Sequence, residues 1–579
     1  METIDKLLHR TIEQRKRIAA ATVAVAASLW ICLFSHLGAL GLVGPDEPRY
    51  AWIARAMAQT GDWVTPRLYG NPWFEKPVLY YWFAAIGFRL HLSDEWAARL
   101  PSAIAALIAA LCIGWLAWRF ESADNHDGRS SRHFCPWSAA LLAPLIFATS
   151  VAAIGFARAA TPDMLFASSV TLAMAAAASI LRDAAALRGP VVADPARKSP
   201  AATLLFGAFI GLAVLAKGPA GVVLAGGAVL IWAIATKRWA VAFRLLHPYA
   251  IAAFCVVALP WYVLCAIRNP AFLRVFILQH NFERYVTPMF HHPQPFWFFF
   301  PITLLAILPW TAFLFSAGVD GLEHYREKKW RESPAFFFGC WALFPVLFFS
   351  FSDSKLPSYI LPAVPALALL IAISLARWIE RTSRVAALVF AMFGATWIGL
   401  AAGALVWLRH LPKPPAVDAD LQMGGQTAVA HAPILACVIL ALTVGVAILT
   451  LSSSRKRATI WISLALTCVL VEIAGIAVLP DLDAYYSSRP IGTMLRRDLR
   501  PDRLFAYELP RAKQYGLDFY LGRELQEWSP NDRNAALVLT SPKGFAEIEQ
   551  RGYFRGTLNE PYPGIVFVPI PARSSTAAP

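Results

Sequence analysis

Long apolar runs separated by short polar loops fill the first 480 residues of the chain. The first run covers residues 18–42, and its length of about 25 residues is enough to cross a bilayer as a helix. Because it is too long for a signal-peptide core and lacks a small-residue cleavage pattern, we expect a retained helix. A window of about 19 residues predicts further spans near 97–119, 136–156, 163–181, 201–216, 218–236, 249–267, 296–317, 334–351, 359–378, 385–408, 432–452 and 459–480. The pattern therefore predicts about 13 transmembrane helices.

Basic residues mark one side of this predicted bundle. If the N-terminus is cytoplasmic, each alternate short loop carries Lys or Arg, as the positive-inside rule requires. The outer side then holds residues 43–96, 268–295, 352–358 and everything after residue 480. One interruption decides this assignment, because reading Lys217-Gly218-Pro219 as a bend inside one helix would reverse the side of all later segments.

The tail after residue 480 differs in character from the apolar part. Charged residues are more frequent there. Short β-type runs at 504–507, 536–539 and 565–568 alternate with helical candidates at 490–499 and 544–551. We therefore expect two domains. They are a transmembrane catalytic domain over 1–480, whose outer loop 43–96 carries membrane-surface helices, and a small periplasmic α/β domain over 481–579.

Composition supports a polytopic α-helical membrane protein. Hydrophobic residues make up 58% of the chain, charged residues 15%, and the mean hydropathy is +0.51, which excludes an ordinary soluble protein. The net charge of +15 follows the loop pattern, and no zinc-finger spacing or basic stripe indicates nucleic-acid binding. The eight cysteines lie in or beside apolar runs without a CxxC motif, so we expect no disulfide framework.

Two carboxylates follow the first predicted helix directly. Asp46 and Glu47 lie between Pro45 and Pro48, and because proline stops a helix, they occupy a stiff turn at the bilayer surface. One of them could face a substrate there. Acidic residues also favour helix N-termini, so capping of the next helix is the alternative.

Glu75 and Lys76 occur later in the same outer segment, between Trp73, Phe74 and the aromatic run 80–82. One interpretation is an exposed ion pair of little energetic value. The other is an amphipathic element on the outer leaflet, in which Lys76 meets a lipid phosphate. Both interpretations stay open at this point.

The later outer segments carry further ionisable residues. His280 and Arg284 are four residues apart, so on a helix they share a face that could bind an anion or a metal, although a single histidine is more often structural. Lys355 could extend to the headgroups, or could face a lipid phosphate with Tyr359 as a hydroxyl donor.

Arg158 and Asp163 flank a predicted outer turn. They could form a boundary ion pair. Ionisable groups at membrane depth also indicate functional sites, and these two are predicted on the same side as Asp46.

Five motifs occur in order between residues 40 and 365, and they are Gly44-Pro45-Asp46-Glu47-Pro48-Arg49-Tyr50, Phe74-Glu75-Lys76-Pro77, Arg158 with Thr161-Pro162-Asp163, Ala216-Lys217-Gly218-Pro219, and Lys355-Leu356-Pro357-Ser358-Tyr359-Ile360-Leu361-Pro362. Together they resemble the motifs of the aminoarabinose transferases that modify lipid A. That family is related to the protein O-mannosyltransferases within the polyprenyl-phosphate-sugar glycosyltransferases.

The resemblance implies a GT-C type fold and an inverting transfer on the periplasmic face of the bacterial inner membrane. The implied donor is undecaprenyl phosphate-linked 4-amino-4-deoxy-L-arabinose, the acceptor is a lipid A phosphate, and no nucleotide is needed. By position, the resemblance implies catalytic roles for Asp46, Glu47, Arg158 and Asp163, donor phosphate contacts for Lys76, Tyr80, Arg284, Lys355 and Tyr359, and a divalent metal held by Glu75 and His280.

Two alternatives remain. The same fold could transfer the sugar to a protein hydroxyl or another glycan, which would require Asp46 as a base. A transporter of a lipid-linked sugar would share the topology, but we would expect internal repeats and broken midplane helices, which the sequence does not show.

Overall fold

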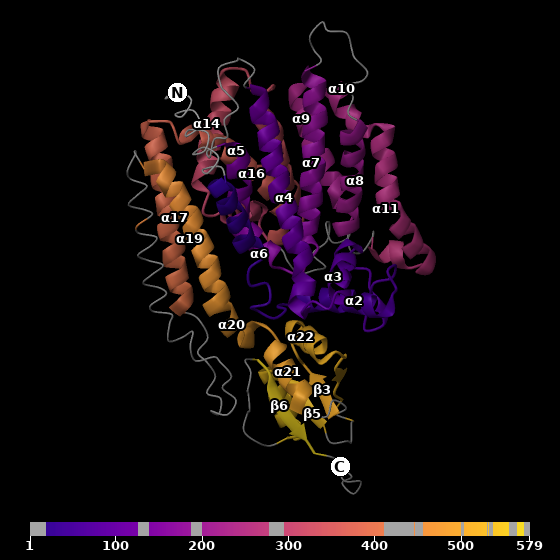
Figure 1. Cartoon of the computed structure of the whole chain (residues 1–579). Helices are drawn as coiled ribbons and strands as arrows, with labels where there is room; N and C mark the ends of the chain where they lie inside the picture. Colours follow the sequence, from indigo (N-terminus) through magenta and orange to yellow (C-terminus); the bar gives the residue numbers. More distant parts are fainter. Residues whose placement is uncertain are drawn as a thin grey trace, which may run out of the picture.

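The computed structural model describes residues 19–124, 138–186, 200–276, 294–409, 445, 455–498, 503–529, 531, 536–554 and 564–571. Within them, seven helical segments are long and apolar enough to cross a membrane. Their elements are α4 (Asp94–Asp124), α7 (Asp163–Ala186), α8 (Pro200–Lys217), α10 (Trp239–Ala242) with η3 (Phe243–Leu246) and α11 (Pro248–Arg268), η7 (Pro357–Ala363) with α16 (Val364–Trp378), α17 (Arg384–Arg409), and α19 (Lys456–Ile473) with η10 (Ala474–Val478) and α20 (Leu479–Tyr486). The chain is therefore a multi-pass membrane protein (Figure 1).

Shorter apolar helices occupy most of the other predicted positions. They are Ala19–Leu33, the bent pair α5 (Ala139–Ala148) and α6 (Val151–Ala157) at 61°, α9 (Ala220–Thr236), η6 (Phe296–Phe298) with α13 (Phe299–Ala306), and α15 (Pro334–Ser350). The predicted span 296–317 is divided between α13 and α14 (Ala312–Arg326), because Pro309 lies between them and has no amide to donate. Apart from residue 445, the predicted span 432–452 lies outside the described residues, so the count of 13 stays a prediction.

The helices α8 and α9 form an antiparallel hairpin and not one bent helix. Gly207 and Ile210 of α8 line the same pocket as Val229 and Ala233 of α9, which one continuous helix could not bring together. Gly218 makes the turn with a φ of +89°, a conformation that favours glycine. The hairpin keeps the predicted alternation of the later helices.

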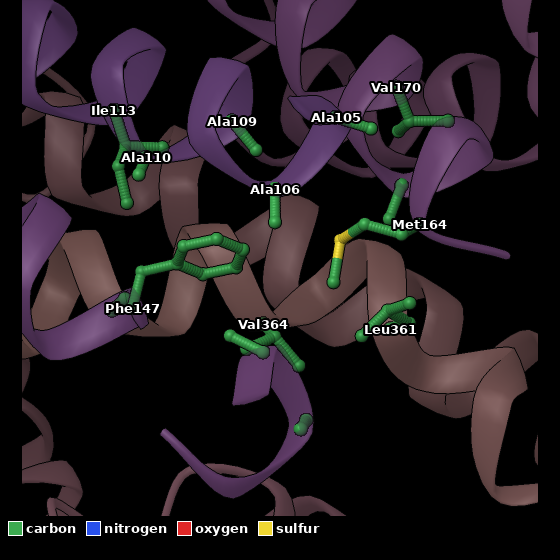
Figure 2. Close-up of a cluster of buried hydrophobic side chains, with 14 of the residues drawn as sticks. Ala105, Ala106, Ala109, Ala110, Ile113, Phe147, Met164, Val170, Leu361 and Val364 are labelled. Carbon is green, nitrogen blue, oxygen red and sulfur yellow. The ribbon is translucent and has the colours of Figure 1, made fainter. Parts of the chain in front are cut away.

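Small residues allow the helices around α4 to approach closely. Figure 2 shows buried side chains from α4, α5, α7, η7 and α16 in contact, including Ala105, Ala106, Ala109, Ala110, Ile113, Phe147, Met164, Val170, Leu361 and Val364. Because the alanine side chains of α4 are small, neighbouring backbones lie near one another and pack by van der Waals contact. This tight core holds α7, whose first residue, Asp163, belongs to the candidate site.

The outer loop folds across one end of the bundle. Figure 1 shows α2 (Asp46–Thr60) and α3 (Leu79–Arg89) at the lower end, and a small antiparallel ribbon of β1 (Arg67–Leu68) and β2 (Asn71–Pro72) connects them. The tail lies at the same end in Figure 1, so the outer loop and the tail share one face of the bundle, as the sidedness pattern predicts.

The tail contains a mixed four-stranded sheet of order β4-β3-β5-β6. Its elements are α21 (Arg489–Asp498), β3 (Leu504–Tyr507), α22 (Arg511–Leu521), β4 (Gln526–Glu527), β5 (Ala536–Thr540), α23 (Pro542–Gln550) and β6 (Val566–Ile570). Strand β3 pairs in parallel with β4 and β5, whereas β5 and β6 are antiparallel. The three predicted strands and both predicted helices are present, while α22 and β4 were not predicted. The domain boundary at residue 480 stays a prediction.

Buried polar contacts hold the tail against the membrane part. The Tyr520 hydroxyl of α22 donates to Glu95 at 2.8 Å, and Arg489 pairs with Asp483 at 2.7 Å and with Glu95 at 3.3 Å. Asp518, also on α22, is fully buried. We call Glu95, Asp483, Arg489, Asp518 and Tyr520 the tail interface.

Candidate active site

The first turn of α2 begins the candidate site. Asp46 opens the helix after Pro45, but no side chain caps the N-terminus. The Asp46 side chain is 54% exposed and pairs with Arg49 at 2.5 Å, while the same nitrogen of Arg49 lies 2.9 Å from Glu75. Arg49 therefore joins a carboxylate on α2 to one in the loop before α3.

Two lysines extend this pairing. Lys76 Nζ lies 3.4 Å from Glu75, and Lys217 at the end of α8 pairs with Asp163 at the start of α7. The charges of Lys76 and Asp163 also act on Asp46, so all these groups lie in one place. We call Asp46, Arg49, Glu75, Lys76, Asp163 and Lys217 the charged cluster.

The protein environment changes the acidity of Asp46. Partial burial raises its pKa, Arg49 opposes that rise, and the nearby negative charge of Glu75 adds to it. Asp46 is nevertheless the most exposed of the three cluster carboxylates, since the side chains of Glu75 and Asp163 are 13% and 14% exposed. It is therefore the carboxylate best placed to meet a second substrate.

Aromatic rings surround the cations of the cluster. The Arg49 guanidinium carbon lies 5.4 Å from the Trp73 ring centre and 5.7 Å from that of Tyr515, which belongs to α22 of the tail. Lys217 Nζ lies 5.1 Å from the ring centre of Tyr359. Such cation–π contacts hold a charge in place without occupying its hydrogen-bond donors. Tyr359 thus lies beside the cluster, in keeping with its predicted contact with the donor.

Glu47 belongs to the structural framework. It is 5% exposed, and its carboxylate accepts two hydrogen bonds from Arg99, at 2.7 and 3.2 Å, and one each from the backbone amides of Val43 and Ala160. The predicted catalytic role for Glu47 is therefore not supported, because these donors already occupy its oxygens. Its contacts instead join the start of the outer loop to the turn before α7.

Arg158 also lies apart from the cluster. Its guanidinium donates to the carbonyls of Ile31 and Cys32 at the end of the first helix, and Asp163 pairs with Lys217 instead. The last carbonyls of a helix have no partner within the helix and attract a cation. Arg158 therefore anchors the end of the first helix in this structure, and its catalytic role stays a prediction.

Tyr80 and Lys355 are likewise bonded to backbone carbonyls. The Tyr80 hydroxyl, on a side chain only 1% exposed, donates to Ala98 at 2.8 Å. The buried Lys355 ammonium donates to Gln294 at 3.0 Å and to Ser352. The structure therefore does not support their predicted contacts with the donor phosphate.

Two further predicted residues lie outside the described part of the chain. These are Arg284, predicted at the phosphate, and His280, predicted at a metal, and both roles stay predictions. Among the described residues, no three His, Cys, Asp or Glu side chains are grouped so as to hold a metal ion. Glu75 contacts Arg49 and Lys76, so a metal at Glu75 would lie beside two cations.

The sequence motifs contained Arg49 and Lys217 but gave them no role. Both lie at carboxylates that are mostly buried, and a buried carboxylate requires a partner of opposite charge. Searching the motifs for cations to match Glu75 and Asp163 is the signal that could have identified them.

Comparison with solved structures establishes the fold. The chain shares the fold of ArnT from Cupriavidus metallidurans bound to undecaprenyl phosphate, with a TM-score of 0.70 and 23% identity over 97% of this chain and 99% of that chain. The apo state of that protein also gives a TM-score of 0.70. The predicted polytopic helical fold of GT-C type is confirmed.

Sequence comparison confirms the predicted resemblance. Residues 18–276 match the family described as dolichyl-phosphate-mannose-protein mannosyltransferase. Two relatives are named undecaprenyl phosphate-alpha-4-amino-4-deoxy-L-arabinose arabinosyl transferase. The Edwardsiella ictaluri protein is 32% identical over 57% of this chain and 54% of its own length, and the Aeromonas salmonicida protein is 30% identical over 61% and 60%. In these matches the chain spans little more than half the length of its relatives.

Proposed function

We propose that this chain is an integral membrane glycosyltransferase that moves 4-amino-4-deoxy-L-arabinose from undecaprenyl phosphate to a phosphate of lipid A. The charged cluster carries this proposal, because it gathers three cations and three carboxylates at the end of the bundle where the outer loop lies. The names of the relatives and the undecaprenyl phosphate in a structure of the same fold support the choice of donor.

The reaction would take place on the periplasmic face of the bacterial inner membrane. The basic alternate loops support a cytoplasmic N-terminus. The outer loop, the cluster and the tail lie at one end of the bundle, so they would all face the periplasm (Figure 1).

Lys76 and Lys217 are the cations that we assign to the donor phosphate. Lys76 Nζ lies 3.4 Å from Glu75, and because an ammonium has three donors, an incoming phosphodiester can bind the same lysine. Negative charge grows on the polyprenyl phosphate as it leaves, and fixed cations in a partly dehydrated site stabilise that charge. Tyr359 beside Lys217 and the predicted Arg284 would complete this phosphate site.

An inverting transfer needs one displacement. A lipid A phosphate oxygen forms a bond to the anomeric carbon while the bond from that carbon to the polyprenyl phosphate oxygen breaks, and the electron pair leaves with the phosphate. The acceptor is already an anion at neutral pH, so Asp46 need not remove a proton. Its carboxylate would orient the acceptor or stabilise positive charge on the sugar.

A hydroxyl acceptor is the second candidate, and the match to a family described as a protein mannosyltransferase favours it. Asp46 would then be the general base, a role for which its raised pKa is suitable. Residual transfer by Asp46→Asn that recovers at alkaline pH, without a parallel rise in the wild type, would favour this candidate. A residual rate that stays flat with pH would favour the phosphate.

Mass spectrometry of lipid A from cells with and without this chain tests the proposal. We expect 4-amino-4-deoxy-L-arabinose on lipid A phosphate when the chain is present, and its loss in Asp46→Asn. Glu327→Gln is the matched control, because its exposed side chain pairs with Lys329 outside the cluster. Unmodified lipid A in cells that hold the folded protein and its lipid-linked donor would contradict the proposed acceptor.

A further inference from the structure

Helix α3 carries two adjacent tyrosines with different surroundings. Tyr80 and Tyr81 are each 1% exposed, and each packs its ring against Tyr50 at 6.1 Å between centres. The Tyr80 hydroxyl donates to the Ala98 carbonyl. Within the described residues, the Tyr81 hydroxyl is buried with no hydrogen-bond partner.

A buried hydroxyl without a partner is unusual in a folded protein. Leaving such a group unpaired lowers the stability of the fold, so nearly all buried polar groups bond to protein, water or a ligand. Phenylalanine would fill the same space without that cost. The Tyr81 hydroxyl therefore keeps its donor available for a molecule that binds at this point.

Different charged groups act on the two tyrosines. Tyr80 is influenced by Glu47 and Arg99, the structural pair, whereas Tyr81 is influenced by Glu75, Arg49 and Asp46 of the charged cluster. Consecutive helical residues point about 100° apart, which explains how neighbours reach different groups. Burial, followed by the charge of Glu75, raises the pKa of Tyr81, so its hydroxyl stays protonated and can donate at neutral pH.

We infer that Tyr81 is a specificity-determining residue whose hydroxyl donates a hydrogen bond to a polar group of the donor sugar. This inference rests on the proposed function. The Tyr81 ring packs on Tyr50, and the Tyr50 ring centre lies 5.2 Å from the Arg49 guanidinium carbon of the charged cluster. Its surroundings are Asp46, Arg49 and Glu75, the side of the cluster where the sugar ring would lie between the phosphate and the acceptor.

The experiment compares Tyr81→Phe with Tyr80→Phe in purified protein. For Tyr81→Phe we expect kcat/KM for the sugar-bearing donor to fall about 3- to 10-fold, the loss of one neutral hydrogen bond. Binding of sugar-free undecaprenyl phosphate and the midpoint of thermal unfolding should both stay at wild-type values or rise. Tyr80→Phe should lower the midpoint and leave kcat/KM of the folded protein near that of the wild type.

Each other outcome has a distinct meaning. Wild-type kcat/KM in Tyr81→Phe, with an active wild type, overturns the role of Tyr81 and leaves the proposed function intact. Weaker binding of sugar-free undecaprenyl phosphate by Tyr81→Phe overturns the assignment to the sugar and moves the contact to the phosphate. A wild-type protein that binds undecaprenyl phosphate but transfers nothing to lipid A contradicts the proposed function itself.

Discussion

The charged cluster and the tail interface lie at the same end of the molecule and use the same kinds of side chain, yet their bonding differs. In the tail interface, Asp483 accepts from the backbone amide of Gly41 at 2.7 Å as well as from Arg489. In the cluster, Arg49 and the two lysines pair with carboxylates through side-chain contacts. Backbone bonds of this kind help to fix the charges of the tail interface, whereas we expect the side-chain pairs of the cluster to exchange partners with a ligand.

The largest effect is expected where a fixed charge loses its partner. Arg99→Met would leave Glu47 buried without its cation and should lower stability by about 3–5 kcal/mol. The midpoint of thermal unfolding in detergent measures this loss. Arg457→Met is the control, because its pair with Glu380 is more than half exposed and should contribute less than about 1 kcal/mol. Equal losses in the two variants would contradict the distinction.

Asp518 should make the tail interface sensitive to pH. It accepts from the Tyr69 hydroxyl at 2.6 Å, but burial raises its pKa to about 6. The usual pKa of an aspartate is about 3.9, so the protonated form of Asp518 favours the docked tail. The resulting stability is at most about 3 kcal/mol. It is fully present below pH 4 and is lost as the pH rises through 6. In Asp518→Asn, the midpoint of thermal unfolding should change less between pH 4 and pH 7 than in the wild type. A slope equal to that of the wild type would count against this assignment.

Removing a cation from the cluster should affect transfer more than stability. Lys76→Ala should reduce the rate about ten- to a hundredfold, because one charge-assisted contact with phosphate contributes about 1.5 to 3 kcal/mol. Initial rates with purified donor and lipid A measure the change. Lys543→Ala is the control, since this lysine is 81% exposed in the tail. Undiminished transfer by Lys76→Ala would remove the lysine from the site.

The smallest effect is expected where the tail reaches the cluster. Tyr515 contacts Arg49 through its ring, so Tyr515→Leu should lower transfer about two- to fivefold, the value of a single cation–π contact of about 0.5–1 kcal/mol. The exposed Tyr486 provides the control in Tyr486→Leu. A loss as large as that of Lys76→Ala would mean that the tail takes a direct part in the reaction.

The sequence predicted the helical positions and much of the cluster, because apolar length and ordered motifs are local signals. Asp46, Glu75, Lys76 and Asp163 lie together in the cluster with Tyr359 beside them, and their roles stay predictions. The predictions that the structure does not support concern the direction in which a side chain points.

A pattern shows that a residue is present but not which way its side chain points. Glu47 turns away from Asp46, and Tyr80 turns away from Tyr81, although each pair is adjacent in sequence. Arg158 bonds to the carbonyls of a helix more than one hundred positions earlier, as the separation of 127 residues from Ile31 shows. Such long-range partners come from packing, which one sequence does not reveal.

The adjacent carboxylates of α2 test the central claim most directly. Asp46→Asn and Glu47→Gln each remove one charge with almost no change in shape, and both the transfer rate and the thermal midpoint can be measured on the same preparations. We predict that Asp46→Asn loses transfer about a hundredfold or more at a wild-type midpoint, while Glu47→Gln lowers the midpoint. An inactive Glu47→Gln protein with a wild-type midpoint, beside an active Asp46→Asn protein, would contradict the division between site and framework.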